Sequence, residues 1–428
     1  MPPPLDRRTL LTATAALGVG SIAAHAPGAD PLSGAALYRD VETYSGFGEH
    51  RTGGAPDHTT SRWLAAELKR AGCETELVPW RTQQFFLDRC ELTVGNKQLE
   101  AFPVWWPKAT RQVGTRADLA PLEATTTTKG AIAFAAVDGL TGGGAVLNPG
   151  GPVAAMAKHA VARGATGLIV IERNPIGELV ALNAQDTLAP FPIPVVLVGG
   201  KDEAHIEASL MHGPPVQLAI LGRIEPAAIG YEVLGHIGSG PREVIVSTPS
   251  SGWFHCAGER GPGIAIWLAL ARMVGKATPP GVRFTFIASS GHELDGVGMH
   301  HFLKEIAPQP ERVKSWLHLG AGIATYAYDG ARRLDRVSAA RGLMTNDPAL
   351  MPALERDFEG QPGLKPVLTD KPVGEMSYMA EHGYKCWGIA GGSALHHMRS
   401  DLPARATGQE ILEPTARAIH RALMAAAS

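Results

Sequence analysis

The sequence predicts an α/β protein built from two structural units. After Tyr231, short apolar segments alternate with amphipathic ones, which is the pattern of a sheet covered by helices. The chain has 428 residues, more than one hydrophobic core usually accommodates, so two domains are expected. Its 50 glycines and 33 prolines suit many strand-to-helix turns rather than a helical bundle.

Charge and motif content exclude several function classes. Lys and Arg total 39 and Asp and Glu total 41, which gives a formal net charge of -2. Because no basic or acidic stretch stands out, neither a nucleic-acid partner nor electrostatic membrane attachment is predicted. The segments that follow the expected strands contain no Gly-x-Gly-x-x-Gly and no phosphate-loop pattern, so a nucleotide site is not indicated. Oligomeric state is left open.

Residues 1–26 have the features of an export signal. Arg7 and Arg8 precede a short apolar run, and small residues at 24–26 resemble a cleavage site. The apolar run is brief and interrupted by glycine, so it is not expected to span a membrane. No stable membrane span is expected in the chain that remains after the signal is removed. The segment resembles a twin-arginine signal, which implies a bacterial protein exported to the periplasm or the extracellular space.

The four cysteines do not form a metal-binding pattern. None of them stands in C-x-x-C spacing, so a thiolate zinc site is not predicted. In an oxidising compartment a Cys73–Cys90 disulfide would be possible, and the sequence leaves this open.

The expected elements fall into three stretches. Residues 57–72 read as a helix with an apolar stripe and a terminal glycine, and the aromatic segment 101–107 reads as buried. Residues 109–226 show a different pattern, which predicts short apolar strands around one helix. From 227 to 428, strands and helices alternate, and "VRFTFIASS" is apolar throughout, as in a buried parallel strand.

Four segments at the expected strand ends carry chemically capable residues. They read "STPSSGWFHCAGERGPG", "SSGHELDG", "HLGAG" and "ALHHMRSD". Ligands of open α/β sheets bind beyond the carboxyl ends of the strands, so these segments are where a site is expected. Their order and spacing resemble the co-catalytic zinc aminopeptidase family, which also contains glutaminyl cyclases and transferrin-receptor-like proteins.

The resemblance implies a zinc-exopeptidase-like fold with a mixed central sheet flanked by helices. Residues 35–108 and 227–428 would form this domain. Residues 109–226 resemble the protease-associated domain, a small β-rich module inserted at this point in members of the family.

The resemblance also implies a metal site, in altered form. The family's ligands for the first metal ion fall on Pro249 and Gly320, which cannot bind a metal. The ligands of the second ion fall on Glu259, Glu293 and His397. Two carboxylates, one imidazole and an open position are typical of catalytic zinc, so one zinc ion per chain is expected.

His292 stands where the family has its general base. A neutral imidazole can accept a proton, so His292 is the candidate acid/base group, and Asp295 is a candidate to orient it. Three further residues are candidates for extra ligands or substrate contacts: His255, His396 and Ser251.

These observations predict an exported single-metal hydrolase that cleaves a peptide or small amide bond with metal-activated water. One alternative is an inactive relative that binds a peptide or protein, since the resembled family includes such members. Others are a glutaminyl-cyclase-like acyltransferase and a metal-free serine hydrolase that uses Ser250 or Ser251. The last lacks the Gly-x-Ser-x-Gly elbow.

Overall fold

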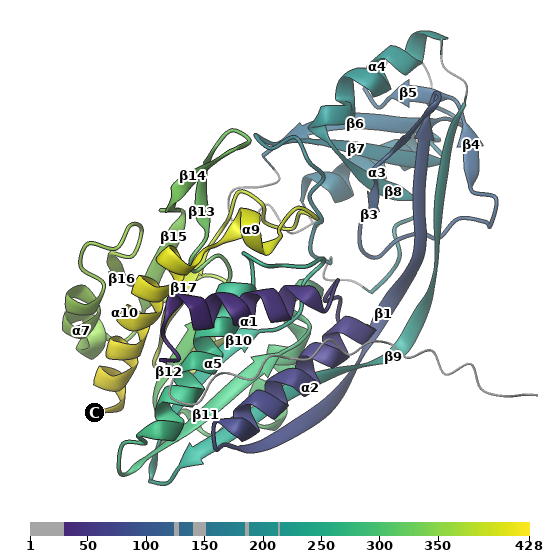
Figure 1. The fold of residues 1–428 in the computed structure, drawn as a ribbon. Helices are drawn as coiled ribbons and strands as arrows, with labels where there is room; N and C mark the ends of the chain where they lie inside the picture. The colour runs from purple at the N-terminus through teal and green to yellow at the C-terminus, as the bar shows by residue number, and fades with distance from the viewer. Residues whose placement is uncertain (1–29, 124–127, 140–150, 185–187, 213–214) are drawn as a thin grey trace, which may run out of the picture.

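The computed structural model describes residues 30–123, 128–139, 151–184, 188–212 and 215–428. The predicted export signal, residues 1–26, lies outside these ranges. The described chain forms a large helix-covered sheet and a smaller sheet, joined by two long strands (Figure 1). None of the helices in the described ranges has both the length and the apolar character that a membrane span requires.

The large sheet has ten strands and contains both parallel and antiparallel pairs. Its order is β16-β15-β17-β12-β10-β11-β9-β1-β2, and β4 pairs with β9 outside this path. The strands are β1 (Glu74–Val94), β2 (Lys97–Leu99), β4 (Thr115–Ala117), β9 (Val216–Gly238), β10 (Arg242–Pro249), β11 (Val282–Ser289), β12 (Val313–Leu319), β15 (Arg341–Thr345), β16 (Pro366–Leu368) and β17 (Cys386–Gly391).

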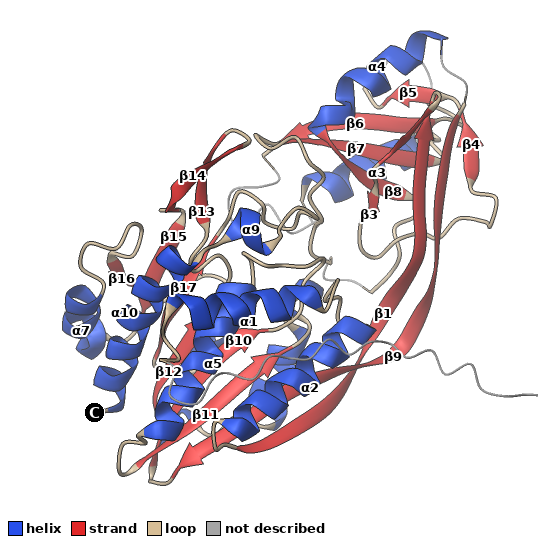
Figure 2. Ribbon diagram, viewed as in Figure 1, coloured by secondary structure: helices blue, strands red, loops and turns tan. Residues whose placement is uncertain are grey.

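Helices cover both faces of this sheet, which confirms the predicted fold class (Figure 2). Val244 and Val246 of β10 pack in one core, and Ile245 packs in another, because successive side chains of a strand point to opposite faces. The first core is completed by α1 (Gly34–Gly46), α2 (Ala55–Arg70), α5 (Gly261–Lys276), α7 (Met351–Asp357) and α10 (Gln409–Ala427), and the second by α6 (Val297–Glu305) and α8 (Met376–Glu381).

The smaller sheet forms a separate layer with its own core. It has five strands in the order β3-β8-β7-β6-β5, of which β5 to β8 are parallel to one another. The elements of this region are β3 (Phe102–Pro103), β5 (Leu119–Pro121), β6 (Ile132–Asp138), β7 (Gly167–Arg173), β8 (Val195–Gly199), α3 (Pro152–Ala162) and α4 (Glu203–His212). The remaining elements are β13 (Tyr326–Asp329), β14 (Arg332–Val337), α9 (Pro403–Ala406) and the short 3-10 turns η1 (Gly200–Asp202), η2 (His292–Leu294), η3 (Pro310–Arg312) and η4 (Pro348–Leu350).

Strands β1 and β9 connect the two sheets. They pair antiparallel from Glu74↔His236 to Thr93↔Gln217, and Figure 1 shows them running from the large sheet to the small one. The expected division between residues 226 and 227 therefore falls inside one continuous strand. The sequence did not indicate strands as long as β1 and β9, because bulges in their pairing interrupt the alternation of side chains along each strand.

Two local features differ from or extend the expectations. Helix α2 starts at Ala55, two residues before the predicted start, with Gly54 as its N-cap. Asp57 lies in the first turn, where its Oδ2 accepts hydrogen bonds from the Gly53 N–H and the Ser290 hydroxyl. All four cysteines, including Cys73 and Cys90, are free thiols.

Helix α5 is expected to contribute strongly to stability because it is buried along most of its length. Leu268 of α5 is 1 % exposed, whereas Leu368 on the edge strand β16 is 51 % exposed. Leu268→Ala should lower the free energy of unfolding by ~2–5 kcal/mol, since it leaves a cavity in the core. Leu368→Ala is the matched control and should change it by less than ~0.5 kcal/mol. Urea unfolding of the mature protein measures both values, and equal losses would contradict this packing.

Candidate active site

The candidate site lies where neighbouring parallel strands of the large sheet end. Strands β11, β10, β12 and β17 are adjacent in that order and parallel, so the loops after their carboxyl ends meet at one edge. The loop after β10 carries Ser251 and Glu259, the loop after β11 carries His292 and Glu293, and the loop after β17 carries His397. The sheet thus brings together residues that are far apart in the sequence.

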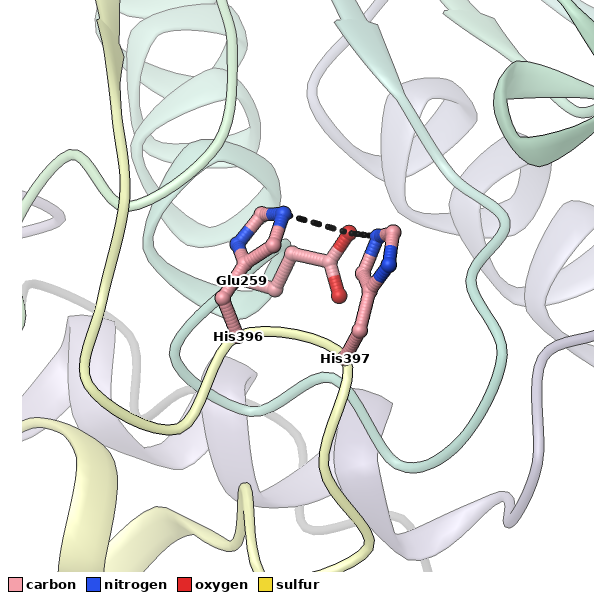
Figure 3. A group of neighbouring side chains, drawn as sticks. All are labelled: Glu259, His396 and His397. Atoms are coloured by element: carbon pink, nitrogen blue, oxygen red, sulfur yellow. Dashed lines mark ion pairs between the residues drawn. The ribbon is translucent and has the colours of Figure 1, made fainter. Parts of the chain in front are cut away.

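One carboxylate and two imidazoles form the centre of the site (Figure 3). Nε2 of His397 lies 3.2 Å from Glu259 Oε1, and Nε2 of His396 lies 3.9 Å from the same atom. The two imidazole rings are stacked, with centroids 4.3 Å apart. One possible ligand atom from each of the three residues lies within 4.8 Å of the others. This spacing suits three ligands that share one metal ion.

A segment from the side of the small sheet fixes His397. This segment, Leu179–Ala184, follows β7 and is largely buried. His397 Nδ1 donates a hydrogen bond to Ala181 O at 2.8 Å, and the Ala181 N–H donates to His397 O at 3.0 Å. The Ala184 N–H donates to Glu293 O at 2.8 Å. A donated Nδ1 hydrogen holds the ring so that Nε2 faces Glu259, which is how metal-binding histidines are usually oriented.

Asp401 holds the backbone of Glu259 in place. Its Oδ1 accepts from the Gly258 N–H at 2.7 Å, and its Oδ2 accepts from the Glu259 N–H at 3.0 Å. A Cβ atom at Gly258 would lie 2.9 Å from Asp401 Oδ1, so only glycine permits this close approach. Burial raises the pKa of Asp401 to about 7.

Arg260 places a cation between two buried carboxylates. Its Nη2 lies 2.8 Å from Glu259 Oε1 and 2.8 Å from Glu293 Oε1. Its Nε donates to Ser251 O at 2.9 Å. The Arg260 side chain is 1 % exposed, and the Glu259 and Glu293 side chains on either side of it are 0 % and 4 % exposed. Burial of such charges is tolerated only when they are paired, as they are here.

The second oxygen of Glu293 is also occupied. Ser251 Oγ donates to Glu293 Oε2 at 2.8 Å, and it accepts from the backbone N–H of Gly291 at 2.9 Å. The hydroxyl of Ser251 thus ties the loop after β10 to the loop after β11. Its proton is engaged with a carboxylate rather than with an imidazole, which does not suit a serine nucleophile.

His292 is oriented by the buried carboxylate of Glu375, which stands 83 residues later in the chain. Its Nδ1 donates to Glu375 Oε1 at 2.8 Å, and Glu375 is fully buried just before α8. On the far side, His318 Nε2 lies 3.9 Å from Glu375 Oε2. His292 is 23 % exposed and is the most accessible of these groups, so it is the one that a substrate can reach.

The charge states follow from these contacts. Burial alone would raise the pKa of Glu259, but the charges of Arg260 and His397 outweigh it and hold this pKa well below its usual range. Burial opposes a charge on His397, yet the neighbouring Glu259 carboxylate raises its pKa. Burial lowers the pKa of His396 to about 3, so this ring is neutral and can offer a lone pair.

Backbone strain is concentrated in these loops. Among the described residues, the non-glycine residues with positive φ are Cys256 at 50°, Asp295 at 62° and His397 at 59°. Each stands in a loop that carries site residues. A left-handed conformation at a non-glycine residue costs on the order of 1–3 kcal/mol, so the surrounding structure must hold it, as is common in functional sites.

The structure brings together a set that differs from the predicted ligands. Glu259 and His397 meet as expected, but the third member of the cluster is His396 rather than Glu293. His255 donates its Nδ1 hydrogen to Ser45 O at 2.9 Å and is not part of the cluster. Asp295, the candidate to orient His292, ends the η2 turn, and the carboxylate at 2.8 Å from His292 is that of Glu375.

The arrangement fits one metal ion better at the cluster than at the predicted set. An ion shared by Glu259 and Glu293 would have to lie where the Arg260 guanidinium bridges them. At the cluster, neither oxygen of Glu259 accepts a well-aligned hydrogen bond from the described residues, although both are buried. A buried carboxylate beside two imidazoles is a donor set suited to zinc.

Known structures share this architecture. No protein-family model and no curated protein sequence matches the chain. The zinc aminopeptidase BSAP from Bacillus subtilis superimposes with a TM-score of 0.71 at 17 % identity, over 93 % of this chain and 96 % of that one. A peptidase M28 precursor from Shewanella amazonensis SB2B gives 0.72 at 16 % identity, over 92 % and 93 %. This chain has the fold of the zinc aminopeptidases.

An aminopeptidase from Aneurinibacillus sp. strain AM-1 is similar to a lesser degree, with a TM-score of 0.61 at 14 % identity over 93 % of this chain and 94 % of that one. The resemblance to zinc aminopeptidases that the sequence motifs indicated is thus confirmed at the level of the fold. At these identities the likeness concerns the fold, so the chemistry has to be argued from this chain's own residues.

The pH dependence of stability should expose the buried carboxyl of Asp57 beside the site. Burial raises its pKa to about 7, above its value in the unfolded chain. Between these two values the folded state holds a proton that the unfolded state has lost, so Asp57 lowers stability as pH rises through this window. Urea unfolding at about pH 5 and about pH 8 should show a smaller loss in Asp57→Asn than in the wild type.

The matched control for this prediction is Asp88→Asn, since Asp88 is exposed on β1. The control should lose stability with pH as the wild type does. An equal loss in Asp57→Asn and the wild type would show that Asp57 does not carry the effect.

Proposed function

We propose that this protein is an exported hydrolase that cleaves a peptide or small amide bond and holds one zinc ion at Glu259, His396 and His397. The observation that carries the proposal is the buried cluster of these three residues, in which neither Glu259 oxygen accepts a well-aligned hydrogen bond from the described residues. The fold of the zinc aminopeptidases supports the reaction class. The arginine pair and apolar run near the N-terminus support export.

Each side chain of the site has a role in this proposal. Zinc held there would supply Lewis acidity, which polarises a carbonyl oxygen and lowers the pKa of water. His292 accepts a proton from the attacking water at Nε2 and later returns one to the leaving amine. Glu375 accepts the Nδ1 hydrogen of His292 and stabilises the ring in its charged form, as a carboxylate does behind a catalytic histidine.

The surroundings support a small substrate portion near the centre. Residues Leu179–Ala184 cover His397 and Glu293 through backbone hydrogen bonds, so the covered side excludes water. His292 and His396, at 23 % and 12 % side-chain exposure, mark the open side. We expect a peptide or amide to approach from there. The region 109–226 would serve as a protease-associated domain that shapes this entrance.

A second candidate is a metal-free protein that binds a peptide or a partner through the same site. One observation favours it: the Arg260 guanidinium pairs with both Glu259 and Glu293 and balances part of their buried charge. Metal content separates the two candidates directly.

Metal analysis of the purified mature protein should find about one zinc ion per chain. Glu259→Gln and His397→Ala should each lose it, because each removes a ligand of a three-ligand site. His159→Ala, at an exposed position on α3, is the control and should retain it. A wild-type protein without metal after dialysis against zinc would leave the second candidate.

Hydrolysis of a panel of aminoacyl anilides and N-blocked peptides should depend on His292. His292→Ala should lower kcat by roughly 10²–10⁴ while metal content is retained, since proton transfer by a side chain contributes that much. Glu375→Gln should lower kcat by a larger factor than it changes KM, and it should change the pH profile of the reaction. Glu381→Gln, at an exposed position, should behave as wild type. Full activity in His292→Ala would remove it from the mechanism.

A further inference from the structure

Arg260 contacts two buried carboxylates of the site at once. Its Nη2 is 2.8 Å from Oε1 of Glu259 and 2.8 Å from Oε1 of Glu293, and its Nε is fixed by Ser251 O. Guanidinium is charged at every physiological pH, so this positive charge is permanent. If the Arg260 side chain moved away, two buried negative charges would repel each other, since all three groups are at most 4 % exposed.

The two carboxylates that share Arg260 differ in what else they bind. Glu293 has both oxygens satisfied, Oε1 by Arg260 and Oε2 by the Ser251 hydroxyl. Glu259 also touches Arg260, yet neither of its oxygens has a well-aligned hydrogen bond within the described chain. Glu259 therefore has more acceptor capacity left for a further cation than Glu293, whose two oxygens are both held by hydrogen bonds.

Charge balance leads to the same conclusion. Two carboxylates carry two negative charges, and Arg260 neutralises one of them. The remaining negative charge lies beside the imidazole of His397, 3.2 Å from Glu259 Oε1, where one bound cation can balance it. A divalent ion between Glu259 and Glu293 would instead lie against the guanidinium, and the like charges would repel each other strongly in a buried site.

We propose that Arg260 is a built-in cation that withholds Glu293 from metal binding and restricts the site to one ion, held by Glu259, His396 and His397. Arg260 is a positioning residue in this proposal: it acts through the two carboxylates rather than on the substrate. The inference rests on the proposed zinc site, and it adds that the metal capacity of the site is set by a side chain of the protein.

The test measures zinc and cobalt binding by the purified mature protein, by elemental analysis and titration calorimetry. Arg260→Met keeps an unbranched apolar stem and removes the guanidinium with its charge, which frees Glu293. We expect a second ion per chain or at least a tenfold gain in affinity, with a changed cobalt absorption spectrum that reports the new ligand. Arg260→Lys keeps a positive charge and should bind one ion as wild type does.

The matched control is Arg272→Met. Arg272 is also a largely buried arginine paired with two carboxylates, Asp40 and Glu67, but it lies away from the site. This variant should bind metal as wild type does, although it loses a comparable set of ion pairs. Wild-type stoichiometry, affinity and spectrum in Arg260→Met would overturn the proposal.

A second variant keeps the test decisive if Arg260→Met does not fold. Glu293→Gln should retain the single ion with an affinity close to that of wild type, because Glu293 is not a ligand. Loss of the metal in Glu293→Gln would overturn the proposal while leaving a zinc site in place. Absence of metal from the wild type would instead count against the proposed function, and a gain of metal by Arg260→Met would then still support the role of Arg260.

Discussion

Two carboxylates, Glu259 and Glu293, are buried around the single guanidinium of Arg260, and the rest of the site is arranged about that ion triad. Removing Arg260 would leave two buried carboxylates without their shared cation, which is strongly destabilising. The triad also joins the two loops that follow β10 and β11, since Arg260 binds Ser251 O and Ser251 binds Glu293. The position of the neighbouring histidines depends on this frame, because Glu259 is the group that they face.

The small sheet contributes to the site through the backbone. The reciprocal hydrogen bonds between Ala181 and His397, and the bond from Ala184 to Glu293, link a segment that follows β7 to loops of the large sheet. His397 has positive φ, a conformation that needs such support. The orientation of the imidazole and the closure of one side of the site are therefore properties of the assembled chain.

The sequence predicts the fold class and the place of the site well, because both depend on local patterns. Apolar strands such as β11 and the polar segments after them are readable in the sequence, and parallel strands gather those segments by geometry. The position of Arg260 was visible next to Glu259, but its contact with Glu293, 33 residues later, depends on the path of two loops. The pairing of His292 with Glu375 spans 83 residues and has no local signal.

The choice between His396 and His397 illustrates the same limit. The sequence resemblance favours His397 as the ligand, yet in the structure both rings lie beside Glu259, and His397 has a left-handed backbone. Similarly, the length of β9 is set by its partner β1 rather than by its own alternation. Such features follow from tertiary contacts, and the local sequence does not predict them.

Anomalous diffraction at the zinc edge, from crystals of the protein loaded with zinc, tests the central claim most directly. The account predicts one peak bounded by Glu259, His396 and His397, with the Arg260 guanidinium still between Glu259 and Glu293. A peak shared by Glu259 and Glu293 with Arg260 displaced, or no peak at saturating zinc, would contradict it.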